Sequence, residues 1–130
     1  MTISEVSKKY DLSQDTLRYY ERIGLLPGVG RNKSGLRDYS EDDCMWVEFI
    51  KCMRSAGLPI EVLIEYVNLF YQGPSTTKAR RELLIEQRGV LSERMEELKK
   101  TIERLDYKIA YYDNTLKLME EELKNPWEQQ

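Results

Sequence analysis

Residues 15–27 read DTLRYYERIGLLP, which places two arginines and two tyrosines in a short segment that ends with a glycine and a proline. On a helix over residues 13–23, Arg18, Tyr19 and Arg22 share the outward face, away from the apolar side chains of the same segment. The two arginines lie four residues apart, so their guanidinium groups can reach neighbouring phosphates or a guanine edge while Tyr19 contacts a sugar or base. This chemistry is typical of nucleic-acid binding.

The simpler interpretation of this face is a solvated helix surface whose arginines are held by acidic neighbours such as Glu21. The following segment, GVGRNKSGLRDYS, predicts a small hairpin that adds Arg31, Lys33 and Arg37. Residues 1–40 carry seven Lys or Arg against five Asp or Glu, which gives +2, whereas the whole chain carries −3. Only the first part of the chain therefore favours an anionic partner.

The composition of the chain excludes several classes of function. There is no histidine, which is the commonest general base and a common metal ligand, so we expect no catalytic residues, no metal site and no cofactor. The two cysteines do not indicate a disulfide scaffold, and neither a signal pattern nor a membrane-spanning apolar run is present. We expect a cytoplasmic protein that is not an enzyme and does not bind membranes.

Helix start and stop signals divide the first part of the chain into short helices. Thr2 with Glu5 forms one capping box and Ser40 with Asp43 another, and Ser13 caps the helix between them. The first two helices, joined by a short turn, have the outline of a helix-turn-helix unit. A fourth, strongly apolar helix starts near Pro59 and ends before residue 73.

A seven-residue repeat dominates the rest of the chain. Two interleaved rows of apolar residues recur at alternating steps of three and four, which is the geometry of a coiled-coil seam. The predicted dimerisation residues are Leu84, Leu91, Met95, Leu98, Ile102, Leu105, Ile109, Tyr112, Leu116 and Met119. A helix of about 70 Å is too long to bury this apolar row against the rest of its own chain, a domain of about 70 residues. We therefore expect the row to pair with that of a second copy in a homodimer.

The sequence TISEVSKKYDLSQDTLRYYERIGLLPGVGRNKSGLRDYSEDD resembles the amino-terminal domain of the MerR family of bacterial transcription regulators. The resemblance implies a mainly α fold, in which a winged helix-turn-helix head with a β-hairpin wing precedes a C-terminal helix that pairs as an antiparallel coiled coil. The expected boundaries are 1–73 for the DNA-binding domain, 75–124 for the dimerisation helix and 125–130 for a short tail.

The resemblance also implies how such a dimer acts. Each second helix lies in a major groove of double-stranded promoter DNA and each wing lies against the backbone, and the spacer is distorted so that RNA polymerase can engage the promoter. Positions matching the family's DNA contacts are Thr16, Arg18, Tyr19, Lys33, Arg37 and Tyr39; Arg22 joins them from the helix face described above.

The sequence offers a candidate thiol for the signal that such a regulator senses. Cys52, next to Lys51 and near Arg54, is expected to border the apolar face of the third helix, either as a reversible electrophile or redox sensor or as core packing. Cys44 is expected to be an ordinary surface thiol. The chain is similar to the NmlR or AdhR group of the family, which lacks a C-terminal effector domain and is associated with aldehyde or nitrosative stress.

Other readings remain open. One is a small-ligand site where the head meets the long helix, drawing on Tyr66, Phe70, Tyr71, Tyr107, Tyr111 and Trp127, although aromatic residues at helical spacing also serve packing. Another is an architectural DNA binder that senses nothing. A third is an adaptor that uses the coiled coil alone and never contacts DNA.

Overall fold

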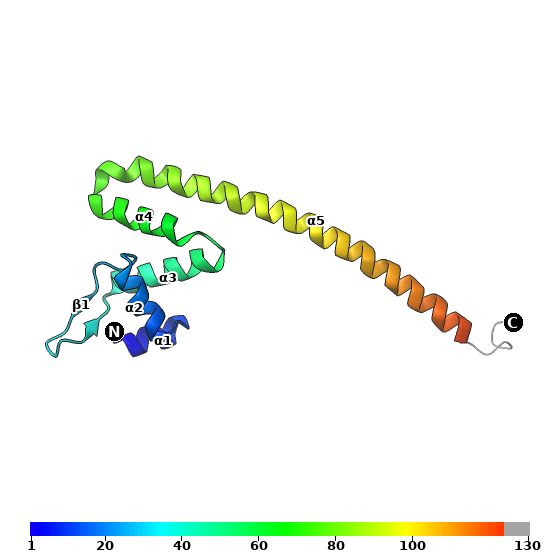
Figure 1. The fold of residues 1–130 in the computed structure, drawn as a ribbon, viewed down its shortest axis with the longest axis horizontal. Helices are drawn as coiled ribbons and strands as arrows, with labels where there is room; N and C mark the ends of the chain where they lie inside the picture. Colours follow the sequence, from blue (N-terminus) through cyan, green and yellow to red (C-terminus); the bar gives the residue numbers. More distant parts are fainter. Residues whose placement is uncertain (124–130) are drawn as a thin grey trace. The chain divides into compact units, whose positions relative to one another are not determined.

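The computed structural model describes residues 1–123 and is mainly helical, as predicted (Figure 1). Its elements are α1 (Ile3–Tyr10), α2 (Gln14–Arg22), β1 (Gly30–Arg31), β2 (Arg37–Asp38), α3 (Glu41–Ser55), α4 (Ile60–Gln72), a 3-10 turn η1 (Pro74–Thr76) and α5 (Thr77–Leu123). The chain forms two compact units, Met1–Arg88 and Gly89–Gln130. The predicted tail at 125–130, with Trp127, lies outside the described residues.

The predicted caps begin the short helices. Thr2 accepts a hydrogen bond from the Glu5 N–H and the Glu5 side chain accepts one from the Thr2 N–H, which completes the capping box of α1. Ser40 and Asp43 make the same reciprocal pair at the start of α3. Because each cap satisfies backbone donors left free in the first turn, these helix starts are determined by residues adjacent in sequence.

A tight turn joins α1 to α2. Asp11 ends α1 in the left-handed region at φ 52°, and its N–H donates to the Ser7 carbonyl. Ser13 then caps α2 by accepting from the Thr16 N–H at 3.0 Å. The two helices contact each other and α1 also contacts α3. The core of the head consists mainly of aliphatic side chains, namely Val6, Leu17, Leu25, Leu26, Val47, Ile50, Leu58, Leu63 and Val67.

The wing is a two-stranded antiparallel hairpin. Gly30 pairs with Asp38 and Arg31 with Arg37. The Asn32 side-chain oxygen accepts from the N–H groups of Ser34 and Leu36, at 2.9 and 3.1 Å. Asn32 therefore organises the tip, as expected for a residue that mimics a backbone turn.

The two faces of α3 differ from the arrangement expected from its sequence. Cys44 is buried and Cys52 is exposed, so the expectation of a surface Cys44 and a half-sheltered Cys52 is wrong. The buried stripe runs through Asp43, Cys44, Val47 and Ile50. A second apolar stripe carries Trp46 and Phe49, which contact aromatic rings of α4. Because α3 carries apolar residues on two sides, a prediction that allows only one buried face places that face between the two real ones.

The helix α5 buries no residue in the described chain. Both rows of its heptad repeat are open to solvent. Leu98, Ile102, Leu105, Ile109, Tyr112 and Leu116 are each between 55% and 62% exposed. A continuous apolar row of this length is unfavourable in water, since each large side chain that leaves water contributes about 1.5 to 3 kcal/mol.

Candidate nucleic-acid interface

Helix α2 presents the charged and aromatic face expected from its sequence. Leu17 and Tyr20 are buried, whereas Arg18, Tyr19 and Arg22 are exposed. The Arg22 guanidinium carbon lies 5.4 Å from the centroid of the Tyr19 ring. An arginine over an aromatic face is held by attraction to the ring quadrupole, so Tyr19 restricts the positions of Arg22.

Arg18 is positioned by two residues from the first turn of the same helix. Its Nη1 donates to Asp15 Oδ1 at 3.0 Å and its Nη2 donates to Gln14 Oε1 at 3.2 Å. The Asp15 side chain is 96% exposed, so this ion pair is screened by water and contributes little to stability. What it provides is a preferred direction for the guanidinium group, along the exposed face of the helix.

Thr16 lies at the amino-terminal end of the same face. Its hydroxyl is 2.8 Å from the hydroxyl of Ser13, and its N–H donates to that same oxygen. The Thr16 hydroxyl is thus committed to the cap, and the residue as a whole is half-buried. It borders the exposed face rather than projecting from it.

The wing adds cationic groups that differ in how they are held. Arg31 Nη1 donates to the Gly35 carbonyl at 3.2 Å, which fastens this guanidinium group to its own hairpin. Lys33 lies at the exposed tip. Gly35 adopts φ +79°, a conformation that side-chain-bearing residues rarely adopt, and this makes the tight return of the chain possible.

Arg37 connects the wing to α2. Its Nε donates to Glu21 Oε2 at 2.6 Å, and both side chains are 24% exposed. The hydrogen bond to the Glu21 carboxylate raises the pKa of Arg37 above its usual value, so the guanidinium group stays charged throughout the working range. The partner of Glu21 is therefore in the wing, sixteen residues away, and not among neighbours on its own helix.

Tyr39 is placed differently from the other expected DNA-contacting residues. Its side chain is buried, with 2% of the residue exposed, and within residues 1–123 its hydroxyl has no hydrogen-bond partner. Burial raises the pKa of the Tyr39 hydroxyl, and the negative charge of Glu21 adds to this effect while Arg37 opposes it. The ring is thus buried, within the electrostatic influence of Glu21 and Arg37, rather than on the outer surface.

The two thiols lie in contrasting surroundings. Cys44 Sγ lies 3.8 Å from the Met1 sulfur, inside the head. Cys52 is exposed on α3, and the charged groups of Lys51 and Arg54 form hydrogen bonds elsewhere. The Lys51 ammonium group donates a hydrogen bond to the Tyr10 carbonyl, and Arg54 Nη1 donates one to the Leu58 carbonyl at 2.9 Å.

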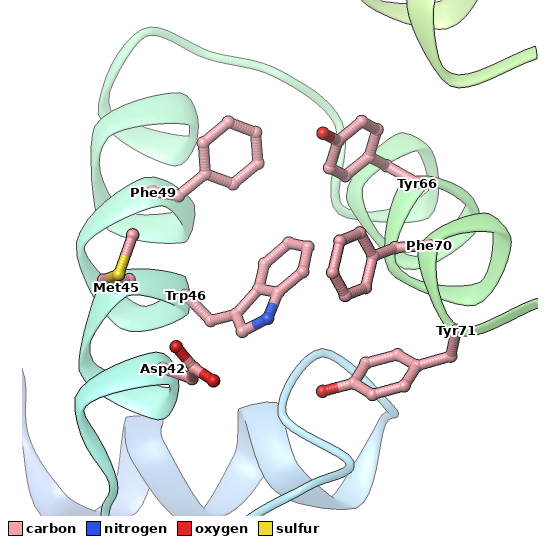
Figure 2. A pocket seen from close by; sticks show the side chains of 7 residues that line it. All are labelled: Asp42, Met45, Trp46, Phe49, Tyr66, Phe70 and Tyr71. Carbon is pink, nitrogen blue, oxygen red and sulfur yellow. The ribbon is translucent and has the colours of Figure 1, made fainter. Parts of the chain in front are cut away.

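An aromatic groove lies between α3 and α4, with a volume of about 460 Å³ (Figure 2). It contains three of the aromatic residues expected from the sequence, Tyr66, Phe70 and Tyr71. Tyr107 and Tyr111 belong to the second unit, and Trp127 lies outside the described residues. The contribution of α3 was not predicted from the sequence, although a spacing of three and four residues places its members on one helix face: Asp42, Met45, Trp46 and Phe49.

Within residues 1–123, no three His, Cys, Asp or Glu side chains are grouped to hold a metal ion. Across the same residues, no helix combines the length and the apolar character needed to cross a bilayer.

Comparison with known proteins agrees with the arrangement of head, wing and long helix. Residues 1–69 match the MerR HTH family of regulatory proteins, and residues 45–107 match the MerR DNA-binding family. The HTH-type transcriptional regulator AdhR of Bacillus subtilis (strain 168) is 55% identical over 93 residues, which cover 72% of this chain and 66% of AdhR. The match therefore spans just under two thirds of that relative.

Solved structures share the fold over nearly the whole chain. A crystal structure from Listeria monocytogenes, described as a MerR family transcriptional regulator, has a TM-score of 0.88 and 47% identity, covering 95% of this chain and 93% of that one. HiNmlR, described as a MerR family regulator lacking the sensor domain and bound to promoter DNA, has a TM-score of 0.82 and 29% identity, covering 90% and 93%. The chain belongs to the MerR family of DNA-binding transcriptional regulators.

Proposed function

We propose that two copies of this protein pair through α5 and present their two α2 faces to double-stranded promoter DNA. The observation that carries the proposal is the exposed Arg18–Tyr19–Arg22 face of α2, tied to the wing by Arg37 and Glu21. Guanidinium groups at this spacing suit phosphates and guanine edges, and Lys33 extends the cationic surface along the hairpin.

The uncovered apolar row of α5 supports pairing with a second copy. An identical helix offers a row with the same spacing, so an antiparallel pair buries both seams at once. We expect the two-fold relationship to give a pair of α2 faces suited to two half-sites on one side of the duplex. By analogy with the family, the bound dimer distorts the promoter spacer and thereby controls engagement of RNA polymerase.

A salt titration of binding to the protein's own promoter tests the DNA contacts. Arg18→Ala and Arg37→Ala should each weaken operator binding by about tenfold and make the slope of log K against log salt less negative by about 0.9. Arg81→Ala, which removes an equal charge from an exposed position on α5, is the matched control and should leave both quantities unchanged. If the α2 and wing variants behave like this control, the adaptor reading replaces DNA binding through this face.

The proposed signal is an electrophile that reacts with Cys52. Exposure of this thiol supports access for a small reactive aldehyde, and the burial of Cys44 supports a single reactive site. With an α,β-unsaturated aldehyde, the thiolate forms an S–C bond at the β-carbon, the C=C double bond becomes single, and the proton lost by the thiol ends on the α-carbon. The modified side chain is larger and more polar, on the helix that leads to α4.

Transcription from the protein's own promoter distinguishes the thiol from the alternatives. Cys52→Ser should abolish induction by the electrophile while operator affinity stays within about twofold of the parent. Cys44→Ser is the comparison and should retain induction. Full induction in Cys52→Ser would disprove the thiol sensor, and absence of any induced response in the parent protein would favour an architectural DNA binder that senses nothing.

A further inference from the structure

The aromatic groove between α3 and α4 has an acidic end and a mainly aromatic end, and the aromatic end also carries the Tyr66 hydroxyl (Figure 2). Figure 2 shows the Asp42 carboxylate, the indole nitrogen of Trp46 and the Tyr71 hydroxyl at one end, with Phe49 and Tyr66 toward the other. A volume of about 460 Å³ is in the range of small-molecule sites. The groove therefore fits one ligand that is charged or polar at one end and hydrophobic at the other.

The aromatic rings of the groove form a connected set. Trp46 is the central member, with its centroid 5.0 Å from that of Phe70 and 6.0 Å from those of Phe49 and Tyr66. The Trp46–Phe70 planes meet at 79° and the Phe70–Tyr71 planes at 84°, so the rings stand nearly perpendicular. Perpendicular neighbours present faces and edges to the same space, and the faces are electron-rich.

The rings are only partly covered by the rest of the protein. Phe70 is 42% exposed and Tyr71 is 53% exposed. Packing within the head therefore leaves a substantial part of this aromatic surface in water, where a ligand can reach it.

The acidic residue at the polar end is available to a ligand. Asp43, the neighbour of Asp42, is buried and accepts the Ser40 N–H at 2.9 Å within the capping box. Asp42 is exposed and, among the residues the structure describes, its carboxylate forms no hydrogen bond or ion pair. Burial raises the pKa of the Tyr71 hydroxyl, with the charges of Asp43 and Asp42 adding to the effect, so Tyr71 remains a neutral donor and acceptor at this end.

The aromatic cluster already attracts a cation from the protein itself. The Arg80 guanidinium carbon lies 5.2 Å from the centroid of Phe70, while the side chain is held by the Thr76 and Thr77 hydroxyls, each at 3.1 Å. Arg80 does not line the groove, so its charge acts at Phe70 and leaves the Asp42 end without a basic side chain. Electron-rich faces with one open carboxylate select positive charge.

We propose that this groove binds a small organic cation, with its ammonium group at Asp42 and Trp46 and its hydrophobic body against Phe49, Tyr66 and Phe70. A quaternary ammonium with an aromatic body fits best, since it is attracted by the ring faces and by the charge of the carboxylate and, having no N–H, needs no hydrogen-bond acceptor. Within the head, such a site also lies next to the loop that precedes the wing. A Cβ added at Gly28, just before the wing, would lie 3.2 Å from the Tyr71 hydroxyl, so Tyr71 packs closely against that loop.

The test compares two ligands of one shape. We would titrate the full chain, without DNA, with 3-hydroxyphenyltrimethylammonium and with 3-tert-butylphenol, in which a neutral carbon replaces the nitrogen. Calorimetry gives the affinities, and the indole N–H resonance of Trp46, assigned with Trp46→Phe, reports the location. The cation should bind about tenfold more tightly than its neutral counterpart and shift the Trp46 resonance.

Matched variants locate the charge selection. Asp42→Asn should reduce the preference for the cation to about twofold, while Glu41→Gln, which removes the same charge from the same turn of α3, should preserve it. Equal affinities for the two ligands, or a preference that survives Asp42→Asn, would overturn the proposal. If neither ligand binds and Trp46→Ala weakens self-association in sedimentation, the groove is an interface between copies, which overturns it as well. Since no DNA is present, failure here leaves the DNA-binding assignment unaffected.

Discussion

Arg37 in the wing donates its Nε hydrogen to Glu21 Oε2 in α2 at 2.6 Å. The two residues belong to different elements, and their pairing fixes the spacing between the helix face and the hairpin. An ion pair that is three-quarters covered keeps more of its attraction than an exposed pair, because less water screens it. The surface that we propose for DNA binding is thus already assembled in the free protein.

Removing the Glu21 carboxylate should lower the specificity of DNA binding without lowering the affinity for random DNA. In Glu21→Ala the wing loses its anchor, so we expect the ratio of operator affinity to random-DNA affinity to fall by about fivefold, with about 1 kcal/mol lost from the free energy of unfolding. Affinity for random DNA should hold or rise, since a negative charge leaves the DNA-facing surface. Competition binding with the two DNAs measures the ratio.

Glu48→Ala is the control for that experiment, because it removes an exposed carboxylate from α3 without touching the wing. An unchanged specificity ratio in Glu21→Ala would show that the ion pair has no role in positioning the wing.

At Tyr39 we expect a substitution to stabilise the folded protein rather than destabilise it. Its buried hydroxyl has no partner within residues 1–123, and a buried unpaired polar group costs about 1 to 3 kcal/mol. Tyr39→Phe should therefore raise the free energy of unfolding, by up to about 1 kcal/mol after the ring relaxes. Urea unfolding at pH 7 measures this change, and destabilisation would show that the hydroxyl has a partner.

The same residue predicts a pH dependence. The pKa of Tyr39 is raised in the folded protein, so the folded state holds the phenol proton more tightly than the unfolded chain does. The associated stability is complete below the ordinary tyrosine pKa, near 10, and is lost as pH rises through the folded pKa. Thermal unfolding between pH 8 and pH 11 should thus show a decline that is smaller in Tyr39→Phe; Tyr19→Phe, at an exposed ring, is the comparison.

The wing tip can be loosened without changing its charge. Asn32→Ala removes the oxygen that accepts from Ser34 and Leu36, so we expect operator affinity to fall by about threefold to fivefold at every salt concentration. Asn32→Asp retains an oxygen that can accept both hydrogen bonds but adds a negative charge, so its loss should be large at low salt and shrink as salt screens the charge. If the losses of affinity in Asn32→Ala and Asn32→Asp depended equally on salt, it would be wrong to assign a structural effect to the first and a charge effect to the second.

Short-range patterns predicted much of the fold correctly. Thr2, Ser13 and Ser40 cap helices where expected, because a cap depends on residues within three positions of each other. Tertiary relationships were less accessible. The partner of Glu21 lies sixteen residues away, and no periodicity connects them.

The errors arose where one element serves two neighbours. Cys44 and Cys52 exchanged their expected environments because α3 buries one stripe in the head and packs another against α4. Trp46 was missed as the centre of the aromatic groove for the same reason, since its partner Tyr66 lies on another helix. Tyr39 shares a motif with exposed residues that are expected to contact DNA, yet sequence alone does not show that its ring is buried.

The apolar row of α5 predicts how the protein assembles. Leu98→Asp combined with Leu105→Asp places charges in the proposed seam and should raise the dissociation constant of the dimer at least about a hundredfold. Tyr107→Asp introduces the same charge at a side chain that is 79% exposed and outside the row, and should leave the dimer intact. Sedimentation over a range of concentrations measures both, and a parent protein that stays monomeric would refute pairing through α5.

Since α5 buries none of its residues in the single chain, every copy made in the cell begins with its seam open to water. The proposed pairing would be a second-order encounter, so while chains are scarce the number of assembled pairs would grow with the square of the number of chains. Occupancy of the promoter would respond more than proportionally to changes in synthesis or degradation. The dose of the protein, and not only a chemical signal, would thereby set a threshold for the regulated gene.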